Sequence, residues 1–323
     1  MITRMLWNTP AISVDFCTDQ DAWINGTRPR PSLRFGADWL SQRERLDRAA
    51  RSRALAVFLA ERLPLRPRLI DLGAGTGSLF RFLAPMIARP QRWTFVDADR
   101  SLIATAFDRT AVWAEGCGLS VRLTGSSGAP ALTIRSSHGP WHIESLAIDL
   151  AKVPRGLPFK EIDGVVCSAL LDLTSRRWMG RLVAGLRTPF YASLTVDGRD
   201  AWFPHHPADL AIRLAFRRDQ RRDKGLGLAL GIDAARVAEK VLAKSGFETF
   251  TASSDWRIPR GERSLGRLFA RMTAEAARRA ATGRAGKIAE WTKARLSHAD
   301  QARLTIRIGH RDILALPRNK ALG

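Results

Sequence analysis

Short apolar runs alternate with amphipathic stretches along most of the chain, a pattern that predicts an α/β protein with a parallel sheet. Leu69–Leu72 and Ile162–Ser168 have the length and apolar character of strands buried on both faces. A helical pattern with period 3.6 follows each of them, near 77–88 and 175–185. By the same criteria we expect further strands near 93–97, 142–149, 189–197, 247–254 and 304–316, and helices near 101–115 and 234–245.

The pattern divides the chain into a leader, a core and insertions. Residues 1–36 read as irregular, 37–66 as a helix that precedes the core, and 67–258 as the core itself. Two alternating apolar runs predict a β-hairpin at 119–139, within the core. We expect a second insertion at 199–231, a helical insertion at 259–302 that is split near Gly283 and Gly286, and a final core strand at 303–317.

A glycine-rich turn joins the first core strand to its helix. Arg68–Gly77 reads R-L-I-D-L-G-A-G-T-G, and glycines suit a turn against which a ligand lies, since a Cβ would clash there. A dinucleotide fingerprint G-x-G-x-x-G needs a third glycine at position 78, which is Ser78. The next strand ends in Asp97, at the spacing of about 20 residues from which an acid can accept hydrogen bonds from ribose hydroxyls.

The pattern D-x-G-x-G-x-G followed by this acid resembles motif I of class I S-adenosylmethionine (SAM)-dependent methyltransferases. The resemblance covers about residues 37–257 and the last strand. It implies a doubly wound sheet of seven strands, the last one antiparallel, with helical insertions. It also implies SAM as the cofactor, bound by the following residues: Asp71, Gly73, Ala74, Gly75, Gly77, Asp97, Ala98, Asp149, Leu150 and Ser168.

Within that resemblance, Asp149 follows the third core strand, where the family places an acid that binds the adenine amino group, and Leu150 would cover the ring. The fourth strand and A-L-L-D-L after it resemble motif IV, with Asp172 where several relatives have His. The chain departs from the family between its last two strands, where some forty residues replace a short turn.

The residues that act on the methyl acceptor are less clearly marked. His205 and His206 are candidate general bases because histidine titrates near neutral pH, and an ordinary loop pair is the alternative. Asp172 is a third candidate, or else an acid stabilised by a helix N-terminus. Asp197 either binds substrate or closes a turn. Trp202 and Phe203 either form an acceptor pocket or simply pack.

A polar stripe precedes the glycine loop. Arg43, Asp47 and Arg51 are spaced at i, i+4 and i+8, so they lie near one face of the expected helix and are placed to pair. In the family a helix at this position often covers the cofactor. An exposed, salt-bridged stripe is an equally good interpretation.

Composition limits the class of protein. The 323 residues are 45% hydrophobic, enough for one large core, and contain no apolar run of about 18 residues that predicts a membrane span. The three cysteines are widely spaced and indicate neither a disulfide framework nor a metal cluster, and Cys167 reads as inert core. His205 and His206 are adjacent and lack a third ligand, so we expect no metal site. A cytoplasmic enzyme fits, and the oligomeric state is left open.

The net charge of +21 favours a nucleic-acid partner. Arginine supplies 44 of the 52 basic residues and the charge is dispersed, which is also typical of coding bias. We therefore expect methyl transfer to a small-molecule acceptor, with RNA as the alternative substrate. A third hypothesis is a non-catalytic protein of the same fold. The intact acids and glycines of the cofactor motif disfavour it.

Overall fold

The computed structural model describes residues 36–126, 129–153, 155–281 and 283–318. The expected leader 1–36 lies outside this part of the chain, apart from its last residue. No described helix is long and apolar enough to cross a membrane.

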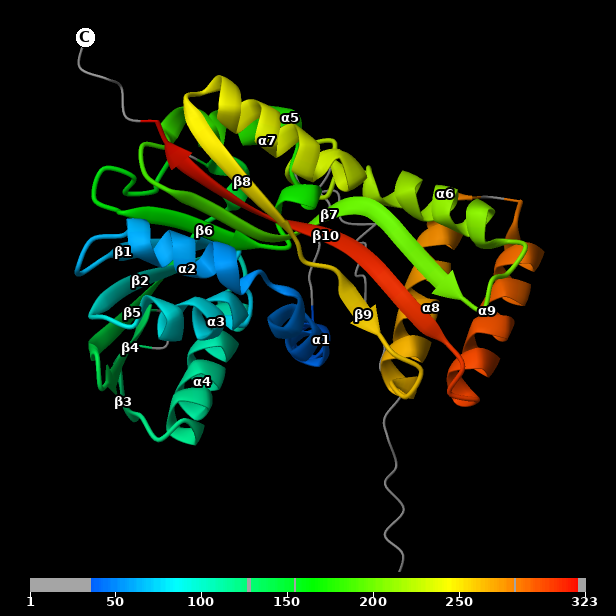
Figure 1. Ribbon diagram of the computed structural model, residues 1–323, viewed down its shortest axis with the longest axis horizontal. Coiled ribbons are helices and arrows are strands. Elements are labelled where there is room, and N and C mark those ends of the chain that lie inside the picture. The colour runs from blue at the N-terminus through cyan, green and yellow to red at the C-terminus, as the bar shows by residue number, and fades with distance from the viewer. Residues whose placement is uncertain (1–35, 127–128, 154, 282, 319–323) are drawn as a thin grey trace, which may run out of the picture.

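Within the described residues, one ten-stranded sheet runs through the molecule (Figure 1). Its main path follows the order β3-β4-β5-β2-β1-β6-β7-β10-β8, and β9 pairs with β10. The strands are β1 Arg68–Leu72, β2 Gln91–Asp97, β3 Ser120–Ser126, β4 Ala129–Ser136, β5 Gly139–Ala147, β6 Gly164–Ser168, β7 Phe190–Phe203, β8 Phe247–Ser253, β9 Trp256–Ile258 and β10 Thr305–Pro317.

The fold predicted from the sequence is confirmed. Strands β5, β2, β1, β6 and β7 pair in parallel, whereas β10 lies antiparallel between β7 and β8. The hairpin β3–β4 continues the sheet beyond β5. The short strand β9 was not predicted from the sequence. It pairs with the half of β10 that projects beyond the core.

Helices cover both faces of the core half of the sheet. One buried cluster joins α2, α3 and α4 to one face, and a second joins α5 and α7 to the other. Adjacent strand residues therefore point into different clusters: Val166 into the first and Cys167 into the second. The bounds are α2 Arg53–Arg62, α3 Ser78–Ile87, α4 Arg100–Gly116, α5 Arg176–Gly185 and α7 Ala234–Lys244.

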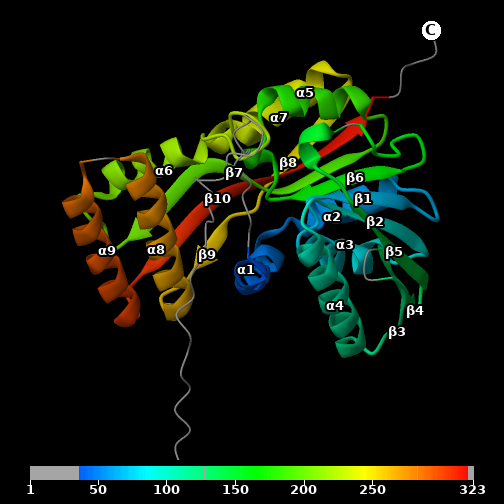
Figure 2. The same ribbon diagram turned by 180° about the vertical axis from the view of Figure 1, so that it is seen from behind.

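The remaining helices form a third buried cluster with the far halves of β7 and β10 (Figures 1 and 2). They are α1 Ala37–Ala50, α6 Asp209–Gln220, α8 Arg263–Ala280 and α9 Ala285–Asp300. The views show α6, α8 and α9 at one end of the molecule and α1 between them and the core. In the part of the chain that the structure describes, three short 3-10 helices connect elements: η1 Leu150–Lys152, η2 Leu171–Leu173 and η3 Gly231–Asp233.

Two sequence expectations need correction. The stretch 37–66 forms two helices, because the Ser52 hydroxyl accepts a hydrogen bond from Leu55 N–H and starts α2, while Ser52 N–H donates to Asp312. The fifth core strand does not end near Asp197. It continues to Phe203 because β10 pairs with it along its whole length, as far as Thr305 opposite Phe203.

Candidate functional site

The glycine loop lies at the carboxyl edge of the sheet, between β1 and α3. Gly73, Gly75 and Gly77 have φ of +67°, +54° and +79°, which an L-residue adopts only under strain. Gly73 and Ala74 N–H groups donate to the Val96 carbonyl at 2.8 and 3.1 Å, which fixes the loop to β2. The loop thus keeps a rigid, open backbone beside the sheet.

A cavity of about 720 Å³, the first cavity, opens over this loop. Nine of the ten sequence-predicted cofactor residues line it: Asp71, Gly73, Ala74, Gly75, Asp97, Ala98, Asp149, Leu150 and Ser168. Gly77 does not. It precedes α3, and a Cβ there would lie 3.0 Å from the Thr110 hydroxyl and 3.3 Å from Phe95. Its role is therefore to let the loop turn into the helix against α4 and β2.

Asp97 ends β2 at the edge of the first cavity. Its two carboxylate oxygens each accept one backbone hydrogen bond at 3.0 Å, from Gly75 N–H and from Asp99 N–H. Burial raises the pKa of Asp97, and these bonds oppose the rise. Each oxygen retains acceptor capacity, so the side chain is oriented to take two further donors.

Asp149 also lines the first cavity. Its carboxylate accepts a hydrogen bond from Ala151 N–H at 2.8 Å and begins η1, whose first residue, Leu150, is buried. The Trp178 indole N–H donates to the Leu150 carbonyl at 2.6 Å. The cap formed by Asp149 and this indole contact therefore hold in place the two residues that are predicted to bind the adenine ring.

Asp71 lies beneath the loop and is buried. Neither carboxylate oxygen has a hydrogen-bond partner among the described residues. Desolvation raises the pKa of Asp71 from 3.8 to about 8, although the Arg51 charge opposes the rise. A buried acid without a donor is costly, so this position favours a ligand that brings a donor to the wall of the first cavity.

Helix α1 closes one side of the first cavity through Leu40, Arg43 and Asp47. The expected stripe does pair: Asp47 lies 3.0 Å from Arg43 and 3.8 Å from Arg51. It is not an exposed stripe, because Asp47 and Arg51 are only 1% and 3% exposed. Arg51 donates to the hydroxyls of Ser78, Ser168 and Ser193, and it therefore ties α1 to the carboxyl edge of the sheet.

A second cavity of about 240 Å³ adjoins the first. Four residues line both cavities: Arg43, Ala169, Leu173 and Lys224. The second cavity lies between the core and the helices α6, α8 and α9, and α1, β7, β9 and β10 complete its walls. Two residues that line it, Ala169 and Leu194, have an unusual backbone conformation, with φ of 50° and 54°. Such strain in non-glycine residues is often found at functional sites.

Aromatic rings form much of the second cavity. Trp39, Trp256 and Phe269 contact one another edge to face, with ring centroids 5.5 to 6.4 Å apart. The ring centroids of His310 and Trp256 lie 4.6 Å apart, and those of Trp202 and Trp291 lie 5.1 Å apart. These rings come from six separate elements: α1, β7, β9, α8, α9 and β10.

Most charged residues around the second cavity are paired. Arg213 lies 2.9 Å from Asp200, Arg279 lies 3.0 Å from Asp219, and Arg295 contacts Asp209. Asp172 and Lys224 differ from these residues in their contacts. In the described part of the chain neither has a carboxylate–cation contact within ion-pair distance, and Asp172 Oδ1 is buried without a partner. Burial raises the pKa of Asp172 and lowers that of Lys224, which is typical of functional groups.

His310 is buried on β10 and lines the second cavity. Its Nδ1 lies 3.0 Å from the Ile308 carbonyl, so Nδ1 carries the proton and Nε2 is left as an acceptor. Burial lowers the pKa of His310 to about 4, so the ring is neutral at physiological pH.

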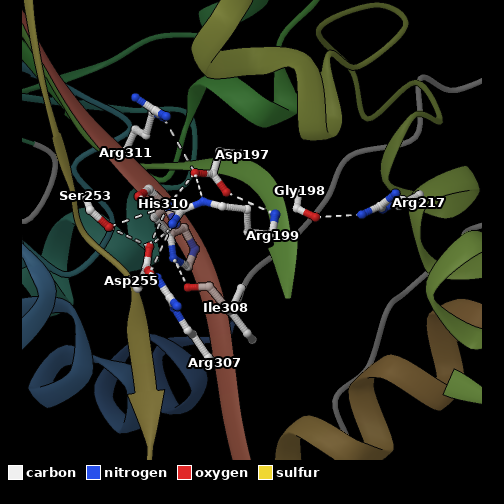
Figure 3. Close-up of polar contacts among 10 residues, drawn as sticks. All are labelled: Asp197, Gly198, Arg199, Arg217, Ser253, Asp255, Arg307, Ile308, His310 and Arg311. Atoms are coloured by element: carbon white, nitrogen blue, oxygen red, sulfur yellow. Dashed lines mark hydrogen bonds and ion pairs between the residues drawn. The ribbon is translucent and has the colours of Figure 1, made fainter. Parts of the chain in front are cut away.

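A polar cluster holds this part of β10 in place (Figure 3). Asp255 accepts hydrogen bonds from His310 N–H at 3.2 Å, Arg199 at 2.8 Å and Arg307 at 2.6 Å. Asp197 pairs with Arg199 and Arg311. The sequence left open whether Asp197 binds substrate or closes a turn. These contacts give it a structural role between β7 and β10.

The predicted catalytic histidines do not reach either cavity. His205 and His206 follow the far end of β7, and His206 Nδ1 accepts from Ala208 N–H at 3.1 Å beside the start of α6. Phe203 is 49% exposed, whereas Trp202 lines the second cavity. The reason is the continuation of β7: it carries these residues past the carboxyl edge at which the sequence placed them.

The sequence did not single out several residues of the second cavity. Lys224 follows α6 in a glycine-containing loop, and Trp39, Trp256 and His310 come from three distant segments. The one available signal was the loop itself, because long loops after strand ends of such sheets often carry ligand-binding residues. Nothing in the local sequence marks Trp256 or His310.

No protein-family model matches this sequence, and no curated protein is significantly similar to it. Among solved structures, the chain is similar to a protein of Bacillus halodurans that carries a provisional methyltransferase assignment. The identity is 12%, over 82% of this chain and 98% of that one, with a TM-score of 0.46.

Two further likenesses are to proteins that were crystallised with ligands. One is a Haemonchus contortus phosphoethanolamine N-methyltransferase with S-adenosylhomocysteine (11% identical, 88% of this chain, 59% of that one, TM-score 0.42). The other is a geranyl diphosphate methyltransferase with SAM (11% identical, 81% and 84% covered, TM-score 0.37).

These likenesses are weak. The assignment of the fold therefore rests on the sheet order, the reversed β10 and the loop after β1. The chain has the class I methyltransferase fold. A fold does not fix an activity, and function has to be argued from the site.

Proposed function

We propose that this protein is a SAM-dependent methyltransferase that acts on a small-molecule acceptor. One observation carries the proposal: a cofactor-sized cavity over the glycine loop adjoins a second, smaller cavity at the carboxyl edge of the sheet. Ligands of open α/β sheets bind at this edge. Two adjoining cavities there supply one place for a donor and one for an acceptor.

The residues of the first cavity fit SAM. A volume of about 720 Å³ lies in the usual range for ligand sites. Asp97 has acceptor capacity on both oxygens for two ribose hydroxyls. The ammonium of the methionine part is the kind of donor that the buried carboxylate of Asp71 lacks.

SAM supplies a methyl group that is already activated on a sulfonium. The protein then has to align the acceptor with that methyl, exclude water and accept the proton that the acceptor loses. Arg43, Ala169, Leu173 and Lys224 line both cavities and so surround the path between them. Helix α1 covers one side of the first cavity, and α6, α8 and α9 line the second.

RNA stays the second candidate substrate, because the net charge is +21. The arginines around the second cavity are largely neutralised by carboxylates, which favours a small acceptor there. Salt-tolerant, nanomolar binding of one RNA would reverse this ranking.

Calorimetric titration with SAM tests the proposal. We expect wild type to bind, and Asp97→Ala to weaken binding at least ~100-fold, since two hydrogen bonds to a charged group are lost. Asp300→Ala, an exposed acid at the end of α9, is the matched control and keeps wild-type affinity. No binding by wild type, or equal binding by Asp97→Ala, contradicts the proposal.

A further inference from the structure

Two ionisable side chains that form no ion pair within the described residues lie near the junction of the two cavities. Lys224 lines both cavities and Asp172 lines the second. Each affects the pKa of the other, yet no contact within ion-pair distance joins them among the described residues. An acid and a base that face a common space without neutralising each other leave room for a group of a ligand between them.

The loop that carries Lys224 has a defined conformation. Asp223 accepts hydrogen bonds from Gly225 N–H at 2.8 Å and Gly227 N–H at 3.0 Å. Gly227 has φ of +87°, and a Cβ there would lie 2.8 Å from the Ser175 hydroxyl. The loop is thus packed closely against the start of α5, and this packing sets the direction in which Lys224 leaves the backbone.

The rest of the second cavity is suited to a flat apolar ligand. Trp39, Trp256 and Phe269 present ring edges and faces, and the neutral ring of His310 adds another face. The volume of about 240 Å³ limits the ligand to one or two fused rings with small substituents.

We propose that the second cavity binds an aromatic acceptor that carries a hydroxyl group, with this hydroxyl placed between Asp172 and Lys224, and that Asp172 takes its proton during O-methylation. This inference rests on the proposed methyltransferase function and names the acceptor class of the same site.

The hydroxyl oxygen forms a bond to the methyl carbon, and the carbon–sulfur bond breaks with its electron pair going to sulfur. The hydroxyl proton passes to the Asp172 carboxylate, and S-adenosylhomocysteine and the methyl ether are released. The raised pKa of Asp172 brings it closer to the range in which a carboxylate accepts a proton efficiently.

The charges favour a hydroxyl over the other common acceptor groups. The ammonium of Lys224 stabilises negative charge that develops on an oxygen, whereas it disfavours the positive charge that an amine nitrogen gains. A carboxylate acceptor would need no base and would be repelled by Asp172. A phenolic hydroxyl is the group that uses both side chains.

The test uses the full chain saturated with S-adenosylhomocysteine and three matched probes: 2-naphthol, 2-naphthylamine and naphthalene-2-carboxylate. We expect 2-naphthol to bind tightest and to show the absorbance of its anion at a pH below that at which it ionises in water. Asp172→Asn is expected to weaken 2-naphthol binding at least ~10-fold and to abolish the anion signal.

Lys224→Met provides a second variant, expected to lose the anion signal while it retains naphthalene-ring binding. The controls Asp108→Asn and Lys240→Met alter exposed residues on α4 and α7. With SAM in place of the product, wild type is expected to form 2-methoxynaphthalene.

Tighter binding of the amine or the carboxylate probe overturns the inference, as does an unchanged anion signal in both variants. Failure of the proposed methyltransferase function would give a different binding result. In that case wild type would not bind S-adenosylhomocysteine at all, whatever the probe. Loss of 2-naphthol binding with cofactor binding intact would therefore remove the acceptor class alone.

Discussion

Asp71 shows at the residue scale how burial sets the chemistry of this site. Its pKa is about 8 in the folded chain and 3.8 in a solvated one. Between these values the folded chain retains a proton that the unfolded chain has released. The stability that Asp71 contributes is therefore fully present below about pH 4 and is lost as the pH rises through about 8.

We predict that, without SAM, the melting temperature of wild type falls between pH 6.5 and 8.5. Below this window His310 acts in the opposite direction, because its pKa falls from 6.5 to about 4 on folding. Asp71→Asn removes the titration and should show a smaller slope over the same window. Differential scanning calorimetry checks both chains, with Asp108→Asn as control. Equal slopes in wild type and Asp71→Asn would contradict the assignment.

At the scale of elements, buried charges join α1 to the core in addition to its apolar packing. Asp47 pairs with Arg43 and Arg51, and Arg51 continues to three serines at the edge of the sheet. Breaking such a pair from one side leaves an uncompensated charge in the interior.

We therefore predict that Asp47→Ala destabilises the fold by about 3 kcal/mol, since Arg51 stays buried without its carboxylate. Urea unfolding followed by tryptophan fluorescence measures the change. Glu61→Ala, at an exposed position on α2, is the control and is expected to change stability by less than about 0.5 kcal/mol. A similar loss of stability in both variants would mean that Arg43, Asp47 and Arg51 do not connect α1 to the core.

The extension of β7 determines which of the sequence-predicted residues reach the site. Trp202 remains within it, whereas His205 and His206 are carried beyond it. Strand patterns in sequence show where a strand begins more clearly than where it ends, because the end depends on what pairs beside it. Here the partner is β10, about a hundred residues later in the chain.

We predict that replacing both histidines by Ala leaves SAM affinity within about threefold, since neither ring lines the cofactor cavity. Turnover, once an acceptor is known, should also stay within about threefold of wild type, because neither ring lines the second cavity. A fall in turnover of ~100-fold or more would restore the histidines as catalytic residues.

At the scale of the whole molecule, the insertions at 199–231 and 259–302 form one structure. Helix α6 from the first insertion packs against α8 from the second, and α8 packs against α9. Together they pack against the far halves of β7 and β10 at one end of the molecule (Figure 1). Residues of all three helices also line the second cavity. The long interval between the last two core strands, which departs from the family, thus supplies part of the wall of that cavity.

The sequence by itself determined the order of core elements and the glycine-loop side of the first cavity. Asp71, the glycine loop and Asp97 lie within thirty residues of one another, and their geometry follows from a strand, a turn and a helix that are adjacent in the chain. Local hydrogen bonds fix such geometry, so local sequence predicts it.

Only the tertiary structure decided the second cavity. Trp39, Lys224, Trp256 and His310 meet there from segments spread over most of the chain, and no spacing in the sequence records that meeting. Their chemical properties are likewise products of packing. The pKa values of Asp172, Lys224 and His310 shift because neighbouring elements remove water from them, and a sequence does not show which water is removed.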